Sequence, residues 1–521
     1  GTIINTDSIA SNDFNYIGSV LDFEHAYVLC FTDITTGEIY GEVIPHSKTN
    51  LVSEIVSLGL KEVIFESSID RAITDVLDKQ FKISITYNDN TECDVAYNYI
   101  FSEITDERII KCLKKLLAYI TVNQQKILTH LQKIVIRENK NILKMDIHTK
   151  RNLELTETLR LKQRNYSLIW LLDKTKTAAG SRMLKSFIEN PLVNKDEINK
   201  RYDIVETLLE EFILKEDLTG LLSEVYDLER LSGRITFGNA NARDLLQLKN
   251  SLKVLPDINN ILRDIHFKQI EEFKDLYNLL EESIYENPPV SVKEGYLIKE
   301  GYNAELDELK DLRKGGKDFV ARFEIEEKER TGIKTLKVGY NKVFGYYIEV
   351  SKGAINLVKD EYGYERKQTL SNCERYISPI LKEKEALILN AEERIIELEY
   401  ELFNEIKDKI KTYIPALQET SKILSEIDVL NSFATVSSEN NYIRPTLTDD
   451  RDVRIIENRH AVVEKVLNDR YVSNDIIMDP NTNILLITGP NMAGKSTYMR
   501  QFAITVIMAQ IGDRKSTRLN S

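Results

Sequence analysis

The sequence is poor in cysteine, proline and tryptophan, and it contains no long uninterrupted apolar segment. Its 521 residues include 4 Cys, 10 Pro and 1 Trp. The four cysteines lack the spacing of a disulfide framework or a zinc site, which favours free thiols in a reducing compartment: Cys30, Cys93, Cys112 and Cys373. No apolar run is long enough to span a bilayer, and the first residues lack the basic and apolar pattern of a signal peptide. We therefore expect a cytoplasmic protein that does not contact a membrane.

The chain as a whole carries more negative than positive charge, but one segment carries more positive charge. The net charge of −13 argues mildly against a nucleic-acid partner, because phosphate binding needs clustered Lys and Arg. Residues 331–384, however, hold ten Lys or Arg against six Asp or Glu. This window is where a polyanion could bind, although a solvated charged surface would have the same composition.

A chain of this length is too long for one hydrophobic core, and we expect three or more domains. The start of the sequence predicts a small α/β domain. Residues 26–44 alternate apolar and polar side chains around Thr-Gly, as in a β-hairpin, and residues 62–68 are typical of a buried strand. From about residue 107 to 290 apolar residues recur at helical spacing.

Two long helical segments flank a short β-rich segment, residues 333–353, that is rich in Tyr and Lys. The second helical segment has a near-heptad apolar seam: Leu387, Ala391, Ile395, Leu398, Leu402, Ile406 and Ile410. This order favours an antiparallel helical arm with a β-rich tip, the alternative being a helix packed on a globular core. Pro415 should interrupt the returning helix.

A phosphate-binding loop stands near the end of the sequence. Residues 489–496 read GPNMAGKS and satisfy the pattern G-x-x-x-x-G-K-[ST]. The preceding ILLIT, residues 484–488, predicts a strand buried in a parallel sheet, and the following segment predicts a well-buried helix. In such a loop Lys495 reaches the β- and γ-phosphates and the Ser496 hydroxyl coordinates Mg²⁺. A glycine-rich turn before a buried helix is the alternative without a ligand.

Several long segments resemble the MutS family of bacterial DNA mismatch-repair proteins. The loop "ITGPNMAGKSTYMRQ" resembles the family's ATPase loop almost letter for letter. "SLIWLLDKTKTAAGSRMLKSFIENPL" and "DLERLSGRITFGNANARDLLQL" resemble its helical core, and "LKVGYNKVFGYYIEVSKG" and "RKQTLSNCERYISPILKEKE" resemble its DNA clamp. The resemblance covers residues 1 to about 512.

The resemblance implies a multidomain protein with α+β and α/β parts. It implies a ribonuclease H-like connector domain at 1–106, a helical core and lever at 107–292, a clamp arm with a β-rich DNA-binding tip at 293–384, returning lever helices at 385–438, the N-terminal part of a P-loop (ABC-type) ATPase domain at 439–512, and a tail that departs from the family at 513–521. The abruptly polar tail is expected to be non-native. Asp33 could be mistaken for a nuclease acid, and we expect a structural role for it.

The resemblance also assigns site residues. Backbone contacts to double-stranded, mismatched DNA are expected from Lys352, Arg366, Lys367, Ser371 and Asn372, whose side chains suit phosphates. Contacts to ATP or ADP are expected from Gly489, Pro490, Asn491, Met492, Ala493, Gly494, Lys495, Ser496 and Thr497, with Tyr471 against the adenine and Ser496 on Mg²⁺. The tyrosines Tyr340, Tyr346 and Tyr347 could stack on bases, but in a β-rich segment we expect them in the core.

The family's function implies an ATP-gated clamp that recruits repair factors. The implied partners are a MutL-type protein at the connector domain and a second copy of the full-length protein, in a bacterial cytoplasm and associated with the nucleoid. The mismatch-reading domain with its Phe-x-Glu motif and the later ATPase motifs are absent from this sequence. We therefore expect a fragment with little or no ATP turnover of its own. Two alternatives remain: a MutS paralogue that clamps recombination junctions, and a coiled-coil ABC-type structural ATPase.

Overall fold

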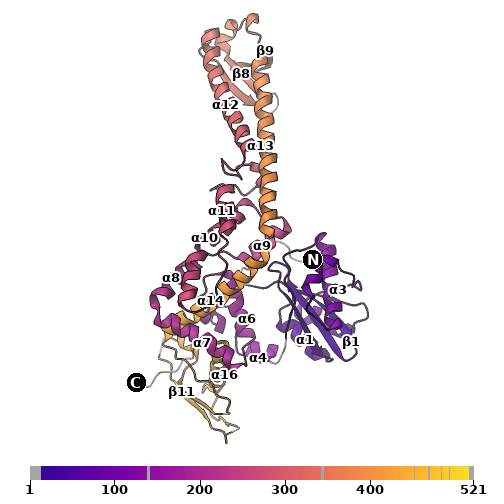
Figure 1. The fold of residues 1–521 in the computed structure, drawn as a ribbon, viewed down its shortest axis with the longest axis vertical. Helices are drawn as coiled ribbons and strands as arrows, with labels where there is room; N and C mark the ends of the chain where they lie inside the picture. Colours follow the sequence, from indigo (N-terminus) through magenta and orange to yellow (C-terminus); the bar gives the residue numbers. More distant parts are fainter. Residues whose placement is uncertain are drawn as a thin grey trace. The chain divides into compact units, whose positions relative to one another are not determined.

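The computed structural model describes residues 13–137, 141–341, 345–450, 452–467, 470–482, 484–491 and 493–514. The chain forms two compact units. Unit 1 comprises Gly1–Ala240, Asn250–Lys274 and Lys411–Ser521, and unit 2 comprises Asn241–Lys249 and Asp275–Ile410. Helices and sheets are both present, as predicted for a multidomain α+β protein (Figure 1). Among the described residues, no helix has the length and apolar character needed to cross a membrane.

Unit 1 begins with a six-stranded sheet in the order β5-β4-β1-β2-β3-β6. Its strands are β1 Tyr16–Phe23, β2 Ala26–Asp33, β3 Ile39–Pro45, β4 Glu62–Phe65, β5 Ser84–Tyr87 and β6 Val135–Ile136. Its helices are α1 Lys48–Ser57, α2 Arg71–Phe81, the 3₁₀ helix Val95–Ile100 and α3 Glu107–Gln124. The predicted hairpin is confirmed, since β2 and β3 pair antiparallel, and so is the predicted strand at β4, which pairs in parallel with β1 and β5.

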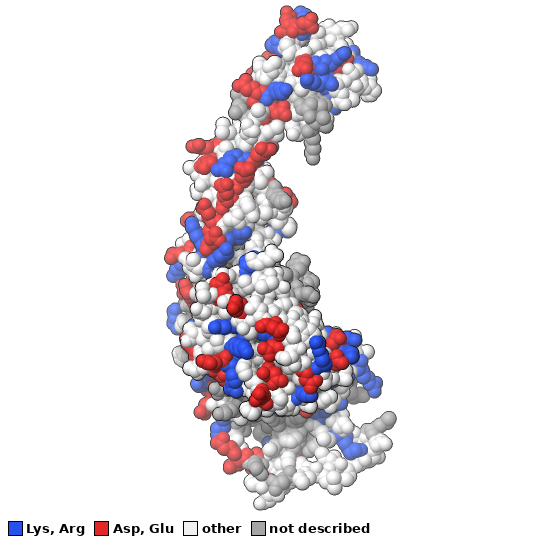
Figure 2. All heavy atoms as spheres, turned by 90° about the vertical axis from the view of Figure 1, so that its right-hand side faces the viewer, with Lys and Arg blue, Asp and Glu red and all other residues white. Residues whose placement is uncertain are grey.

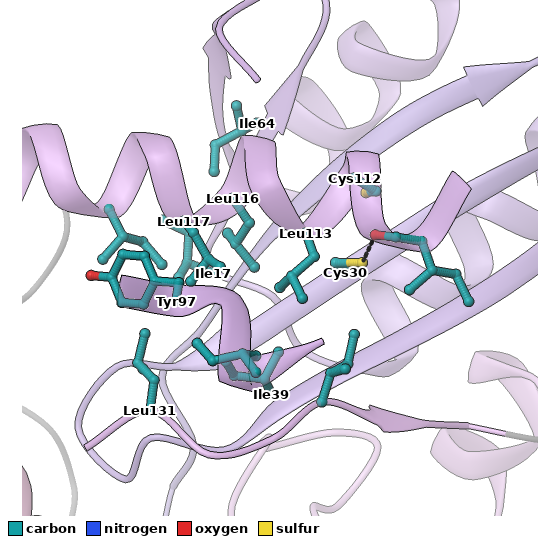
Figure 3. Close-up of a cluster of buried hydrophobic side chains, with 14 of the residues drawn as sticks. Ile17, Cys30, Ile39, Ile64, Tyr97, Cys112, Leu113, Leu116, Leu117 and Leu131 are labelled. Atoms are coloured by element: carbon teal, nitrogen blue, oxygen red, sulfur yellow. Dashed lines mark hydrogen bonds between the residues drawn. The ribbon is translucent and has the colours of Figure 1, made fainter. Parts of the chain in front are cut away.

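Helix α3 covers one face of this sheet with a stripe of apolar side chains (Figure 3). Leu113, Leu116 and Leu117 recur at three- and four-residue spacing and are fully buried. Cys30 and Cys112 lie in the same cluster as free thiols, and the Cys30 thiol donates to the Ile109 carbonyl at 3.7 Å. Burial raises the pKa of the Cys30 thiol, so this group behaves as a small apolar side chain.

A helical part follows, and most of it belongs to unit 1. Its helices are α4 Ile147–Asn152, α5 Leu168–Leu172, α6 Ala178–Glu189, α7 Lys195–Glu210, α8 Phe212–Leu222, α9 Leu228–Phe237, α10 Ala242–Asp264, α11 Lys274–Ser283 and the later α14 Ile414–Asn440. Helix α14 is buried along most of its length. Its Asp428 accepts hydrogen bonds from the backbone N–H groups of Lys176 and Thr177, just before α6. The interruption predicted at Pro415 is confirmed, because the preceding helix ends at Lys411 and Pro415 lies in the first turn of α14.

Unit 2 contains two long helices joined through a small sheet (Figure 1). Helix α12 spans Ala304–Thr331 and α13 spans Pro379–Lys411. Between them lie β7 Lys337–Asn341, β8 Gly345–Ser351, β9 Glu365–Thr369 and β10 Cys373–Ile377, with 3₁₀ turns at Lys352–Leu357 and Asp360–Tyr362; another 3₁₀ turn, Val292–Glu294, precedes α12. The seam residues of α13 from Ala391 to Ile410 are buried, as the heptad pattern predicts; the Leu387 side chain lies outside the described set.

The last part of unit 1 has β11 Val453–Asn458, α15 Ala461–Val466, β12 Asn474–Met478 and α16 Lys495–Ile511. Helix α16 is buried along one side and half-buried or exposed elsewhere, so it is less buried than predicted. The prediction of a buried strand at 484–488 is wrong. The segment has no regular structure, and Ile484 and Leu486 are 85% and 88% exposed. A parallel strand requires neighbours, and the described residues supply none here, since β11 and β12 pair only with each other.

Candidate nucleic-acid and nucleotide sites

The sheet at the end of the arm, which we call the tip (residues 333–378), has its own apolar core. Phe323 of α12 packs with Ile333, Leu336, Ile348 and Val350. The strand order is β7-β8-β10-β9, all antiparallel, so that β9 is an edge strand. The core thus fixes one face of the sheet and leaves the edge and the turns in solvent.

All five residues predicted to contact DNA are exposed on the tip. Ser371 and Asn372 form the turn between β9 and β10, and Arg366 and Lys367 lie on β9. The backbone N–H of Lys352 donates to the Asn372 carbonyl at 3.0 Å, which joins two of the predicted contacts directly. Figure 2 shows Lys and Arg side chains gathered on the face of the tip turned toward the viewer, with acidic side chains beside them.

The cations of the tip differ in how strongly they are neutralised. Lys367 pairs with Glu365, and Arg366 lies 3.4 Å from Glu374. Lys352 has no ion-pair partner among the described residues. Surface ion pairs are weak, about 0–1 kcal/mol, and can exchange a carboxylate for a phosphate at little cost. Lys352 is the one of the three that would meet a phosphate without first breaking a pair.

Lys334 belongs beside these residues, although the sequence patterns did not single it out. The hydroxyls of Thr335 and Ser351 hydrogen-bond at 2.8 Å, so the chain segments that carry Lys334 and Lys352 adjoin. Lys334 is exposed. The contact depends on how the segment before β7 meets the end of β8, a pairing that composition alone does not reveal.

The expectation that the three tip tyrosines lie in the core is wrong for Tyr340, which is 50% exposed on the edge strand β7. Tyr340 meets Tyr346 edge to face, with ring centroids 5.1 Å apart, and Tyr346 and Tyr347 are half-buried. The Arg375 guanidinium stands 4.3 Å from the Tyr347 ring and bonds Glu349 at 3.0 Å. Tyr340 shares the core-facing side of the hairpin with Val338, but it lies near the hairpin end, outside the apolar cluster, which explains its exposure.

The predicted phosphate loop leads directly into α16. Gly494 is the N-cap of the helix, with φ of 81°, a left-handed conformation that glycine adopts without steric cost. No side chain caps the first turn of α16, which leaves its N–H groups directed at the loop. The Lys495 amine donates to the carbonyls of Gly489 at 2.7 Å and Pro490 at 2.5 Å, across the space that the loop surrounds. An uncapped helix N-terminus with a lysine at its mouth fits a phosphate group.

The remaining nucleotide residues lie around this turn. Asn491, Ala493 and Ser496 are exposed, Thr497 is half-buried, and Met492 lies outside the described residues. Tyr471 is held to α16, because its hydroxyl hydrogen-bonds the Gln501 side chain at 2.7 Å. Burial raises the pKa of Tyr471, which keeps the ring neutral. The described residues include no cluster of three or more His, Cys, Asp or Glu suited to a metal ion.

Asp33 has the structural role expected of it. Its carboxylate is fully buried and accepts from the N–H of Asn15 at 2.8 Å and from both the N–H and the hydroxyl of Thr35 at 2.9 and 2.7 Å. These bonds close the turn after β2. Three of the roughly four acceptor positions of the carboxylate are used in this way, which fits a structural role.

The predicted tail is described only at its first two residues. Asp513 is buried, and burial raises the pKa of its carboxyl well above its usual value; Arg514 pairs with Glu206 at 2.6 Å. Residues 515–521 lie outside the described set, and the non-native origin of 513–521 stays a prediction.

Known proteins match this chain over almost all of its length. The family model for MutS domain III matches residues 148–434, more than half of the chain, and that for MutS domain V matches residues 485–514. The chain is 48% identical to the DNA mismatch repair protein MutS of Bacillus licheniformis, over 98% of this chain and 59% of that protein. It is 48% identical to the protein of the same name from Bacillus subtilis, over 98% and 60%, and 45% identical to that from Bacillus cytotoxicus, over 98% and 58%.

The chain thus spans about three fifths of the length of the curated relatives it matches. The matched domains include both candidate sites, the tip and the phosphate loop. The chain belongs to the MutS family.

Proposed function

We propose that this chain is part of a DNA mismatch-repair protein that closes on mismatched duplex DNA under the control of ATP. The relatives carry the name of such a protein. The observation that carries the proposal is the exposed group of cations and small polar residues on the tip, at the end of two long helices. Lys352, Arg366 and Lys367 supply charge to phosphates, while Ser371 and Asn372 supply short donors that fix the register on the backbone.

The phosphate loop would bind ATP or ADP with Mg²⁺. The N–H groups of Asn491, Ala493 and Gly494 would face the phosphates, Lys495 would leave the loop carbonyls for the β- and γ-phosphates, and the Ser496 hydroxyl would ligate Mg²⁺. Bound nucleotide supplies the free energy that separates two states of the clamp. The Tyr471 ring, tied to the second turn of α16, would pack on the adenine.

The remaining assignments follow the family. The mixed sheet of unit 1, antiparallel at β1–β3 and parallel at β1, β4 and β5, supports a ribonuclease H-like connector domain as the contact surface for a MutL-type partner. The helices before and after the arm would form the lever, and β11 to α16 the start of an ABC-type ATPase domain. We propose a homodimer in the full-length protein, a bacterial cytoplasmic location near the nucleoid, and little ATP turnover by this chain alone.

DNA binding by the tip is tested by salt dependence. Affinity for a duplex with one G·T mismatch, for the matched duplex and for a four-way junction would be measured by fluorescence anisotropy between low and moderate salt. Each lost phosphate contact lowers the slope of log K against log salt by about 0.9. The triple variant Lys352→Ala, Arg366→Ala, Lys367→Ala should therefore lower the slope by roughly 2 to 3.

The matched control is Lys314→Ala, an exposed lysine on α12 away from the strands. It should leave the slope unchanged. An equal effect of both variants, or a slope near zero in the parent chain, would rule out the tip as the DNA site. A preference for the junction over the mismatch would instead favour the recombination paralogue.

A further inference from the structure

A cavity in unit 1 is lined by no residue of the tip or of the phosphate loop. Its volume is about 700 Å³. One part of its wall comes from the first sheet and the loop after α1, and another from residues 156–190 of the helical part. The volume falls within the range of small-molecule sites, about 300–1,000 Å³.

Aromatic rings form the floor of this cavity. Phe14 stacks on Tyr16 with centroids 4.8 Å apart, Tyr16 meets the edge of Phe31 at 5.1 Å, and Phe31 stacks with Tyr40 at 5.2 Å. Tyr16 and Phe31 are buried, whereas Phe14 is half-buried. The half-buried Phe14 offers a polarisable aromatic face on which a planar ring can stack.

Cations surround the floor. Five basic side chains line the cavity, against three acidic ones: Lys61, Arg137, Lys162, Arg164 and Lys185, against Asp13, Glu157 and Glu189. Three of the cations are neutralised locally, since Lys185 pairs with Asp13, Arg164 with Asp173, and Arg137 with Glu42 and Glu54.

Two of the cations are not neutralised in this way. Lys61, after α1, and Lys162, in the helical part, are exposed and have no ion-pair partner within the described ranges. Burial raises the pKa of the Glu189 carboxyl, against the opposing effect of the nearby Lys185, Lys150 and Arg137. Lys61 and Lys162 thus remain as unpaired cations on a lining that also holds the aromatic side chains and the exposed Glu157.

We propose that this cavity binds a planar organic anion, of which a purine nucleoside monophosphate is the representative. The ring would stack on the floor at Phe14, and the phosphate would lie between Lys61 and Lys162. A ligand held in this way touches both the sheet and the helical part of unit 1, so its binding would also stabilise their contact. An inorganic ion alone would leave the aromatic floor uncovered, and a neutral ring would leave the two lysines uncompensated.

The test uses AMP and GMP as probes, measured by equilibrium dialysis with the full chain carrying Lys495→Ala. That substitution removes the lysine of the phosphate loop, so that residual binding reports another site. Inorganic phosphate and adenosine are measured in parallel. We expect saturable binding of at least one monophosphate, with phosphate and adenosine each at least about tenfold weaker, because each offers half of the contacts.

Three variants locate the site. Lys61→Glu with Lys162→Glu should weaken monophosphate binding by more than about tenfold, since two charge-assisted hydrogen bonds are lost. Phe14→Ala should weaken the monophosphate but not inorganic phosphate. Lys253→Glu, an exposed lysine of α10 outside the cavity, is the matched control and should change nothing.

Each contrary result overturns the proposal. The proposal is wrong if neither AMP nor GMP binds at millimolar concentration. It is also wrong if the Lys61→Glu, Lys162→Glu variant binds the monophosphate as tightly as the parent, or if Lys253→Glu loses as much affinity as that variant. Phosphate binding as tightly as AMP would exclude the stacking surface. The melting temperature of each variant, with and without AMP, confirms folding, and a ligand-dependent increase should vanish only in the cavity variants.

Discussion

Arg182 of α6 is the largest side chain that the fold of unit 1 buries almost completely, with 1% of its surface exposed. Its guanidinium donates to both carboxylate oxygens of Asp227, at 2.6 and 2.9 Å, and to Glu229 at 2.7 Å. Asp227 is also the N-cap of α9 and accepts the Arg230 N–H. Arg182 therefore joins two helices of the region matched to MutS domain III.

Substituting Arg182 by Met keeps much of the side-chain volume but removes three charge-assisted hydrogen bonds. Two carboxylates then stay buried without their cation, and breaking a buried pair in this way costs about 3–5 kcal/mol. The matched control is Lys79→Met, which breaks an exposed pair with Asp75 whose side chains are 69% and 59% exposed. An exposed i, i+4 pair contributes about 0.3–0.5 kcal/mol.

The free energy of unfolding would be measured by urea titration, followed by circular dichroism and by the fluorescence of Trp170, the single tryptophan, which lies in α5 of the same unit. Adding Asp227→Asn and Glu229→Gln to Arg182→Met should recover part of the loss, because neutral amides cost less to bury than carboxylates. A loss in Arg182→Met no larger than that in Lys79→Met would refute the reasoning that this network holds α6 to α9.

Three further outcomes are expected. Gly233→Ala should destabilise unit 1 by roughly 1–3 kcal/mol in urea titration, because an added Cβ would lie 2.3 Å from the Thr35 carbonyl oxygen and the backbone has to move. Burial lowers the pKa of His460 from 6.5 to about 4, so between these pH values the unfolded chain binds more protons than the folded chain. The free energy of unfolding should therefore fall by about 2 kcal/mol as the pH drops from 7 to 5. A His460→Gln variant should show a smaller decrease when the free energy of unfolding is measured against pH. Replacing Ile484 and Leu486 by Ser should reduce self-association in light scattering, since both side chains are almost fully exposed.

Local patterns predicted the elements whose partners are close in sequence. The hairpin of β2 and β3 is set by alternation around a short turn, and the seam of α13 follows from its heptad spacing. Pro415 lies in the first turn of α14, because a proline has no N–H to donate inside a helix and its ring clashes with the preceding turn. In each case the pattern that carries the prediction lies within one helix or one hairpin.

The sites were predicted unevenly for the same reason. The glycines and lysine of the phosphate loop form a local turn before α16, and the tip cations lie on consecutive strands, so both groups could be found as motifs. Lys334 could not, because its approach to Lys352 depends on the Thr335–Ser351 contact between separate segments. Nor could the cavity between the first sheet and residues 156–190, since its lining comes from segments far apart in the chain.

Residues 484–488 and the tip show why two segments of similar strand propensity differ. In the tip, β8 lies between β7 and β10, and its Ile348 and Val350 bury themselves on Leu336. The segment 484–488 is as apolar as β8, but it has no strand beside it among the described residues, so its N–H and C=O groups find no ladder. Because the tip closes its core with residues of α12, α13 and its own strands, its proposed DNA contacts depend on unit 2 alone. Phosphate binding by the loop, in contrast, depends on whether a partner orders the segment 484–488 that leads into it.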